Sequence, residues 1–393
     1  MIISLNNVVS ATDETSHFGE NFLTRFHLKW YFHRMLKSND PVKIEQQAAE
    51  ALRRVLEEVP AIEHLEVRNV ANEGDRTIDL LAHIDTFGRR HTLVAEVKSS
   101  GQPRQIRPAL LMLKDYVARQ AEPVTPVLIA PYLSAEAQDL CREYEVAYLD
   151  LEGNARLAFG TFFISRHFAS KPAVERRELR SLFKPKSAQV LRQLLREPAH
   201  PWKVTELSEA TGVSLGHVSN VRTALLDKEW AQVSGDGVFL SKPDALLNAW
   251  RKAYEPPVGT RHGFYTTLHG TALTNAIRAL PHSAPDAGKV ALASFSAAQW
   301  LAPYGRTGTH YFYADKRGLE QLRSALQLAS AGKGENVIVT VLDDPGLFRD
   351  TVEPAPGVFC TSPVQTYLDL TDAGERGQEA ADHLRQERLQ WPT

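Results

Sequence analysis

Two β-favouring segments that flank a short turn-forming stretch constrain the first half of the chain most. Residues 77–84 and 91–98 favour β-structure, and the stretch 85–88 between them (Asp-Thr-Phe-Gly) is rich in turn formers. A hairpin that closes symmetrically around this turn places Ile84 opposite His91. The sequence therefore predicts an antiparallel hairpin with a defined register.

This hairpin carries two carboxylates and a lysine. The same register sets Asp79 opposite Glu96, and the side-chain period of two places Glu96 and Lys98 on one face of the second strand. Carboxylates that face each other across a strand pair repel. A divalent cation between them would turn this repulsion into a binding site, and Lys98 would stabilise developing negative charge beside it. Metal-assisted phosphodiester cleavage needs such a set of groups.

Asp79 followed by Glu96-Val97-Lys98 resembles the motif of the PD-(D/E)xK nuclease superfamily, which includes restriction endonucleases and junction resolvases. The resemblance implies that Asp79 and Glu96 bind Mg²⁺ and that Lys98 is the catalytic lysine. Ile78 stands where the family usually has proline. The implied fold is a restriction-endonuclease-like α/β/α domain over residues 1–168, either an active nuclease or an inactive binding scaffold.

The elements expected around the hairpin follow the order of the same family. An acidic residue on the first helix often completes the family's site, and Glu50 and Glu45 are the candidates for that catalytic position. The expected elements are a helix over 42–58, a strand over 65–70, the hairpin, a helix over 107–119 and a strand over 124–130.

Composition permits a multidomain chain and excludes several other classes. With 393 residues, of which 43% are hydrophobic, there is material for two or three domains with their own cores. No apolar run approaches the roughly 20 residues that span a bilayer, and the first residues do not resemble a signal peptide. The two cysteines, Cys141 and Cys360, have no metal-ligand spacing. We expect free thiols and a cytoplasmic location.

The net charge of −2 hides a strong asymmetry along the chain. Residues 171–228 contain eleven basic and six acidic residues, a balance of about +5, whereas residues 341–393 contain ten acidic residues and four arginines, about −6. Nucleic acid should be attracted to the middle of the chain and repelled by its end. The acidic end is expected to meet a protein or the chain's own basic middle.

The basic middle also has a recognisable pattern of elements. Apolar spacing predicts helices over 187–196, 204–210 and 215–228, with a Gly-containing turn before the third helix. Two strands, 230–234 and 238–240, are joined by Gly-Asp-Gly, a strong hairpin signal. Three helices and a hairpin in this order resemble a winged helix-turn-helix over 187–255, preceded by a basic linker over 169–186.

In a helix-turn-helix the third helix enters the major groove, with its first residues against base edges. An Asn there can pair with adenine, and an Arg can pair with guanine or a phosphate. A packing role between proteins is the alternative for this module. The DNA-binding candidates are Ser214, His217, Ser219, Asn220, Arg222, Arg176, Arg177 and Lys186.

Short strands and helices alternate over residues 263–393, without a catalytic constellation. Several phrases in order, at 246–250, 295–298, 362–370 and 376–381, resemble the AbiEi-type antitoxin of type IV abortive-infection toxin–antitoxin systems. The resemblance implies a C-terminal α/β antitoxin-like domain, DNA binding through the winged helix, repression of the protein's own operon, and a nucleotidyltransferase toxin as partner. The long segment in front departs from the typical short antitoxin.

Two functions compete on these observations. The first is a DNA-binding regulator, an antitoxin-like transcriptional repressor of a defence or mobile-element locus, whose nuclease-like domain binds DNA or forms a homodimer. The second is a Mg²⁺-dependent DNA endonuclease that its winged helix directs to duplex DNA. The sequence favours the regulator, and on its charge pattern we expect the chain to keep its DNA affinity without residues 263–393.

Overall fold

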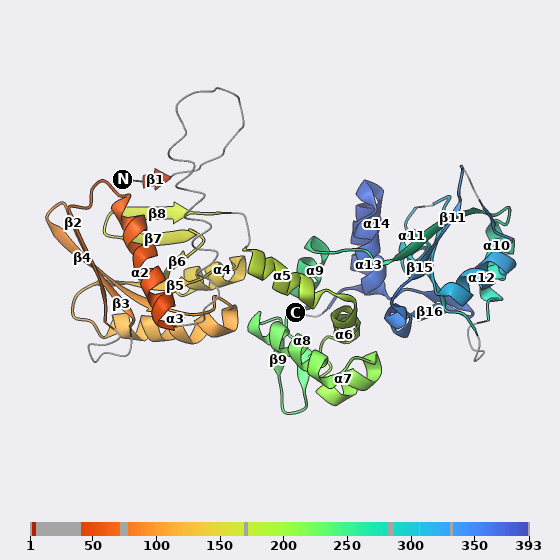
Figure 1. Ribbon diagram of the computed structural model, residues 1–393, viewed down its shortest axis with the longest axis horizontal. Coiled ribbons are helices and arrows are strands. Elements are labelled where there is room, and N and C mark those ends of the chain that lie inside the picture. Colours follow the sequence, from red (N-terminus) through yellow and green to blue (C-terminus); the bar gives the residue numbers. More distant parts are fainter. Residues whose placement is uncertain are drawn as a thin grey trace, which may run out of the picture. The chain divides into compact units, whose positions relative to one another are not determined.

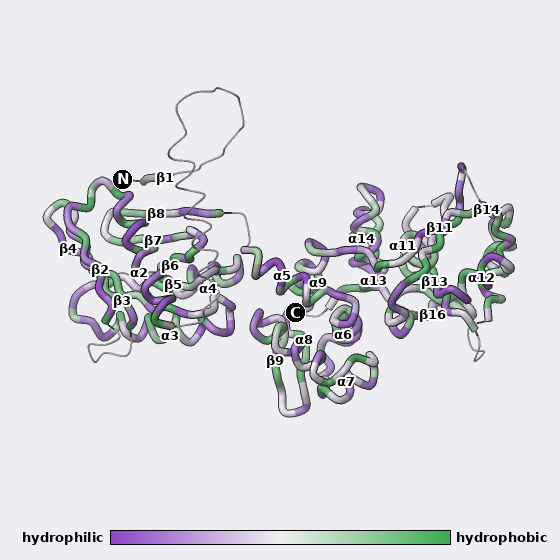
Figure 2. The backbone as a smooth tube through the Cα atoms, in the orientation of Figure 1, coloured by the Kyte–Doolittle hydropathy of each residue, from purple (hydrophilic) through white to green (hydrophobic). Residues whose placement is uncertain are grey.

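The chain forms two compact units, Met1–Ala173 and Val174–Thr393. The computed structural model describes residues 2–4, 41–70, 78–168, 172–281, 287–305, 307–330 and 333–391. Helices of both units alternate hydrophobic and hydrophilic stretches (Figure 2), and no described helix is long and apolar enough to cross a membrane. Cys141 and Cys360 are free, as predicted; both are also buried, and burial raises the pKa of both thiols to about 12.

The first unit is built on a mixed sheet of eight described strands (Figure 1). Their order across the sheet is β1-β8-β7-β6-β5-β4-β3-β2, with β4, β5 and β6 parallel to one another and β2–β4 antiparallel. The strands are β1 (Ile2–Ser4), β2 (His64–Asn69), β3 (Leu80–Thr86), β4 (Arg89–Val97), β5 (Val124–Ala130), β6 (Ala147–Asp150), β7 (Ala155–Phe159) and β8 (Phe162–Arg166).

Helices cover both faces of this sheet. Leu52 and Leu56 of α2 (Pro41–Glu57) pack on one face, and Leu110 of α3 (Pro103–Ala118) packs on the other, together with α4 (Ala135–Glu143). Because successive strand residues point to opposite faces, strands buried on both faces are apolar at most positions. The predicted mixed α/β class is confirmed for this unit, whereas α4 and the strands β6–β8 were not foreseen.

The predicted hairpin forms with the predicted register. Ile84 pairs with His91 and Leu80 with Ala95 between β3 and β4. The two-residue loop at 87–88 has positive φ at both positions, 49° and 70°, which matches the twist of antiparallel strands. The turn-forming residues and the side-chain period of two were therefore sufficient to predict the alignment of these two strands.

The second unit begins with the helix-turn-helix segment, and Gly212, with φ of 67°, ends its second helix in the left-handed conformation. The predicted helices and hairpin are all present, with bounds shifted by a few residues. The elements are α5 (Ala173–Leu182), α6 (Pro185–Arg196), α7 (Val204–Thr211), α8 (Leu215–Asp227), β9 (Ala231–Val233), β10 (Val238–Leu240) and α9 (Pro243–Lys252).

A second mixed sheet, of seven described strands in the order β14-β11-β15-β13-β12-β17-β16, forms the rest of this unit. Its strands are β11 (Gly259–Tyr265), β12 (Val290–Leu292), β13 (His310–Ala314), β14 (Ala329–Ser330), β15 (Val337–Leu342), β16 (Val352–Ala355) and β17 (Val358–Cys360). The helices are α10 (Gly270–Arg278), α11 (Ser294–Leu301), α12 (Lys316–Ala325), the 3₁₀ helix η1 (Pro345–Asp350), α13 (Pro363–Thr371) and α14 (Gly374–Arg388).

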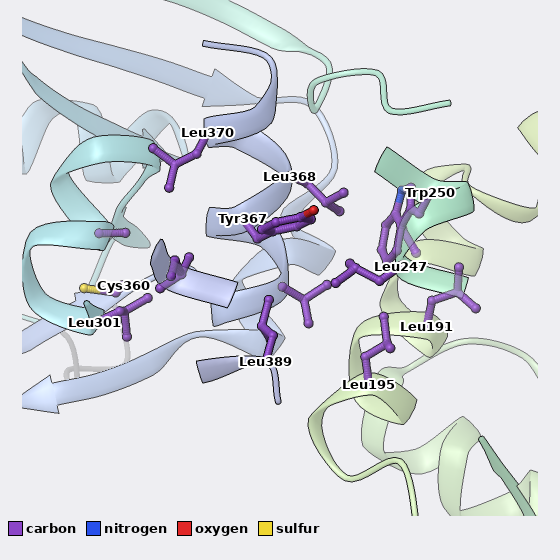
Figure 3. Close-up of a cluster of buried hydrophobic side chains, with 14 of the residues drawn as sticks. Leu191, Leu195, Leu247, Trp250, Leu301, Cys360, Tyr367, Leu368, Leu370 and Leu389 are labelled. Carbon is purple, nitrogen blue, oxygen red and sulfur yellow. The ribbon is translucent and has the colours of Figure 1, made fainter. Parts of the chain in front are cut away.

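One hydrophobic core joins the helix-turn-helix to the second sheet. The buried cluster includes residues from Leu182 to Leu389. In Figure 3, Leu247 of α9 and Leu191 of α6 lie to the right of Tyr367 of α13, and all three belong to the same buried cluster. Helix α9 ends at Lys252, four residues before the paired prolines at 256 and 257, and residues on both sides of these prolines bury their side chains in the same core. The segment predicted as a winged helix is therefore part of a larger folded unit.

Candidate functional site

The two carboxylates of the hairpin lie side by side, as the register predicts. The Asp79 backbone N–H donates at 3.0 Å to the carbonyl of Ala95, the residue that pairs with Leu80, and the Asp79 carboxyl interacts with that of Glu96. The Asp79 Oδ2 atom accepts a hydrogen bond from the Val97 N–H at 2.7 Å. Lys98 Nζ lies 2.5 Å from Glu96 Oε1. The structure thus brings Asp79, Glu96 and Lys98 together.

Burial and charge both act on Glu96, which is 7% exposed. Burial raises the pKa of its carboxyl to about 7, the neighbouring Asp79 carboxylate adds to this rise, and Lys98 opposes it. Near neutral pH the carboxyl is therefore close to its titration midpoint. A cation that entered between the two carboxylates would favour the ionised form of Glu96.

The two acidic candidates on the first helix do not join this pair. Exposed Glu50 forms ion pairs with Arg53 at 3.4 Å and with Arg54 at 3.7 Å. Glu45 accepts a hydrogen bond from Asn69 Nδ2 at 2.9 Å. The reason is that α2 packs on the sheet face to which Leu93 and Ala95 of β4 point. Because successive strand residues point to opposite faces, the Glu96 side chain lies on the other face of the sheet.

A metal site would thus rest on Asp79 and Glu96. Among the described residues, no group of three or more His, Cys, Asp or Glu side chains is placed to hold an ion. Two carboxylates still fit Mg²⁺, which is often bound through one or two carboxylates, with water and substrate phosphates as the other ligands. The metal and catalytic roles stay predictions.

Helix α8, the predicted recognition helix, presents part of the predicted polar face. Ser214, the residue before the helix, is exposed, as are Ser219 and Asn220, while Arg222 is half-buried. Val218, on the opposite side, is fully buried in the core. Amide and hydroxyl groups on an exposed helix face can read base edges in the major groove.

His217 is engaged inside the domain. Its Nε2 atom lies 2.9 Å from Ser187 Oγ of α6, and this hydroxyl donates to the Ser181 carbonyl at 3.1 Å. The hydroxyl therefore accepts from the imidazole N–H. His217 connects α8 to α6 in this arrangement, in place of the base contact that was predicted for it.

The basic segment before the helix-turn-helix is a helix over most of its length. Arg176 and Arg177 are exposed on α5 and remain candidates for phosphate contacts. Lys186, also proposed for DNA, instead lies 3.5 Å from Asp344 Oδ2, in an ion pair with the acidic end of the chain. Leu182 is buried in the core, so the predicted linker packs as part of the second unit.

Arg349 of η1 is a further basic residue at this surface, and no pattern in the sequence indicated it. It is exposed, and its guanidinium lies over Gly212 at the turn between α7 and α8: a Cβ atom at Gly212 would be 2.9 Å from the Arg349 Cζ atom. In helix-turn-helix proteins the elements beside the recognition helix contact the DNA backbone. Arg349 is well placed for a phosphate contact.

The acidic end of the chain was expected to contact either another protein or the chain's own basic middle, and the structure shows contacts with the basic middle. Asp350 Oδ2 lies 3.3 Å from Arg192 Nε, and its Oδ1 pairs with Arg196 Nη2. Arg192 and Asp350 are 5% and 8% exposed. Arg192 and Arg196, which contribute to the positive charge of residues 171–228, therefore form ion pairs within the protein.

The comparison with known proteins concerns the second part of this unit. Residues 239–390 match a protein family described as transcriptional regulator, AbiEi antitoxin, type IV TA system. That match begins in β10 and ends just after α14, so this AbiEi-like region (residues 239–390) includes α9, the second sheet and Asp350. No curated protein and no solved structure matches the chain.

The AbiEi-like region confirms the resemblance that phrases such as 362–370 suggested, and it spans less than half of the chain. Nothing in the comparisons supports the nuclease-like resemblance of the first unit. The helix-turn-helix lies largely before the matched residues, but it shares its core and the Asp350 ion pairs with the AbiEi-like region.

Proposed function

We propose that this chain is a DNA-binding repressor of a type IV toxin–antitoxin locus. The observation that carries the proposal is the AbiEi-like region, built into one core with a helix-turn-helix whose recognition helix is partly exposed. Helix α8 would enter the major groove, with Asn220 against base edges. Arg349, Arg176 and Arg177 would contact phosphates, which set affinity without reading sequence.

Binding of the full chain to duplex DNA from upstream of its own gene tests the proposal, with fluorescence anisotropy as the measurement. Replacing Asn220 with Ala should reduce the preference for this duplex over random DNA, by about 1–3 kcal/mol if it makes a bidentate base contact. Replacing Arg349 with Gln should weaken binding to all sequences and lower the log–log salt slope by about 0.9. Arg323→Gln is the control, because Arg323 is exposed on α12 and pairs with Glu320.

Equal loss of affinity in the Arg323 variant would show a general effect of charge. Salt-independent binding, or none at low salt by a folded chain, would contradict the proposal and leave the winged helix as a packing module. The co-encoded partner implied by the resemblance is a nucleotidyltransferase toxin, which the AbiEi-like region would bind. A homodimer would match a palindromic operator.

A second candidate function rests on the carboxylate pair of the first unit. Asp79 and Glu96 would hold Mg²⁺, which when bound supplies a Lewis acid at a phosphate. The Lys98 ammonium, 2.5 Å from Glu96, is in reach of negative charge that develops beside the pair. The raised pKa of Glu96 is the observation that favours this site, since such shifts gather at functional positions.

Incubation of the full chain with supercoiled plasmid and Mg²⁺ or Mn²⁺ tests this second function. Nicking is expected, and Glu96→Gln should slow it at least about 100-fold, because removing one of two carboxylates should leave the metal weakly held. Glu66→Gln is the matched control, since Glu66 is an exposed residue of β2 that pairs with Arg68. If no DNA form is cut, or if Glu96→Gln cuts as fast as the unmodified chain, the pair belongs to a scaffold without nuclease activity.

A further inference from the structure

A cavity of about 290 Å³ lies within the second unit, between α5, α6, the segment after α9 and η1. Its walls are mainly apolar and include Phe183, Ala188, Trp250, Pro257 and Leu347. The Phe183 and Trp250 rings stack with centroids 5.6 Å apart, so the aromatic wall is already formed. This volume is close to the lower limit of about 300 Å³ for ligand pockets, which favours a small molecule.

Two polar side chains in the wall of the cavity are almost fully buried. Arg192 is 5% exposed and Gln365 is 2% exposed, and Arg192 Nη1 donates to Gln365 Oε1 at 3.0 Å. Arg192 Nε makes no hydrogen bond with the described residues, although Asp350 Oδ2 is 3.3 Å away. A guanidinium has five N–H donors in a planar fork that suits a carboxylate. The polar end of the cavity is therefore suited to an anion.

The acidic residues at the rim do not oppose this assignment strongly. Half-buried Asp344 is paired with Lys186 at 3.5 Å, Asp343 is exposed, and Glu255, which is largely exposed, lies 3.9 Å from Arg180. The charges of Asp343 and Glu255 are screened by solvent and that of Asp344 is offset by Lys186, whereas the charge of buried Arg192 is not screened by solvent. The apolar walls in turn select a ligand whose body lacks charge.

We propose that this cavity binds a small organic carboxylate with an aromatic or branched apolar body, and that the bound ligand alters the affinity for DNA. The second half rests on the proposed DNA-binding function. Its structural basis is α6: Ala188 and Arg192 of this helix line the cavity, and the Ser187 hydroxyl of the same helix lies 2.9 Å from His217 Nε2 of α8. A carboxylate on Arg192 competes with Asp350 for the guanidinium and so acts on α6 and, through it, on α8.

Binding to the full chain is measured by calorimetry with three carboxylates (phenylacetate, indole-3-acetate and 4-methylpentanoate) and with phenylacetamide as the neutral counterpart of the first. At least one carboxylate should bind, and phenylacetate should bind at least about 10-fold tighter than the amide if the charge is read. Ala188→Leu, which fills the cavity, and Val258→Glu, which adds a negative charge at an exposed wall position, should each abolish binding. Circular dichroism of both variants checks that they fold.

DNA affinity is then measured with and without the carboxylate that binds best. A change of about 5- to 150-fold is the usual size of coupling between two sites, and it should vanish in Val258→Glu. No carboxylate binding up to about 10 mM, equal binding of the amide, or unchanged binding in both variants would overturn the site. Carboxylate binding without any change in a measurable DNA affinity would overturn the coupling, whereas a chain that binds carboxylate but no DNA at all contradicts the proposed function instead.

Discussion

Replacing Asp350 with Ala should lower the free energy of unfolding of the second unit by about 3–5 kcal/mol, because it removes the partner of a buried charge. Arg192 and Arg196 both pair with this one carboxylate, and Arg192 is 5% exposed. Without Asp350, the Arg192 guanidinium would remain buried with Gln365 as its hydrogen-bond acceptor. Urea unfolding of the full chain, followed by tryptophan fluorescence and circular dichroism, measures the change.

The matched control is Asp382→Ala. Asp382 also pairs with an arginine, Arg251 at 3.7 Å, but its side chain is 61% exposed. An exposed ion pair contributes about 0–1 kcal/mol, so this variant should unfold close to the unmodified chain. Equal effects of the two substitutions would show that the ion pairs on α6 contribute no more than a surface contact.

The shared core also changes the expectation for truncated chains. Charge alone suggested that the chain would keep its DNA affinity without residues 263–393. Such a truncation removes Asp350 and exposes apolar side chains of α6 and α9, among them Leu191 and Leu247, which are now fully buried. Loss of DNA binding by that truncated chain would therefore reflect loss of folding, and the full chain is the appropriate material for binding experiments.

Replacing Glu96 with Gln should stabilise the first unit at pH 8 by about 3 kcal/mol and leave its stability at pH 4 nearly unchanged. The folded-state pKa of Glu96 is about 7, above the ordinary value of 4.5. Below pH 4.5 the carboxyl is protonated in both states and nothing is lost. Between pH 4.5 and 7 only the unfolded state ionises, so stability falls as pH rises, and above pH 7 the loss is complete. Glutamine cannot ionise and escapes this loss.

Urea unfolding across this pH range checks the prediction, with Glu66→Gln as the exposed control. A Glu96 variant whose stability differs from the unmodified chain by the same amount at all pH values would contradict the raised pKa. Mg²⁺ adds a further comparison: if the pair holds the ion, Mg²⁺ should stabilise the unmodified chain at pH 8 through binding to the folded state. The Glu96→Gln chain should gain much less.

Features that depend on residues close together in the chain could be predicted from the sequence. The period of two and the turn at 85–88 aligned β3 with β4 and so brought Asp79 beside Glu96. Glycine at 212 and the Gly-Asp-Gly turn at 235–237 marked the helix-turn-helix and its hairpin. These signals work because backbone conformation and side-chain direction are set within a few residues.

The surface groups that are available for function, in contrast, depend on contacts between elements that are far apart in the chain. Lys186 is paired with Asp344, His217 is held by Ser187, and Glu50 lies on the helix that covers the opposite face from the carboxylate pair. Arg349 reaches Gly212 from a distant part of the chain. Periodicity shows which side of a helix is polar, but the contact partners of that side come from other elements, 30 residues away for His217 and more than a hundred for Lys186. Packing of those elements, which no local pattern encodes, therefore separates the residues that remain exposed for DNA from those that hold the fold together.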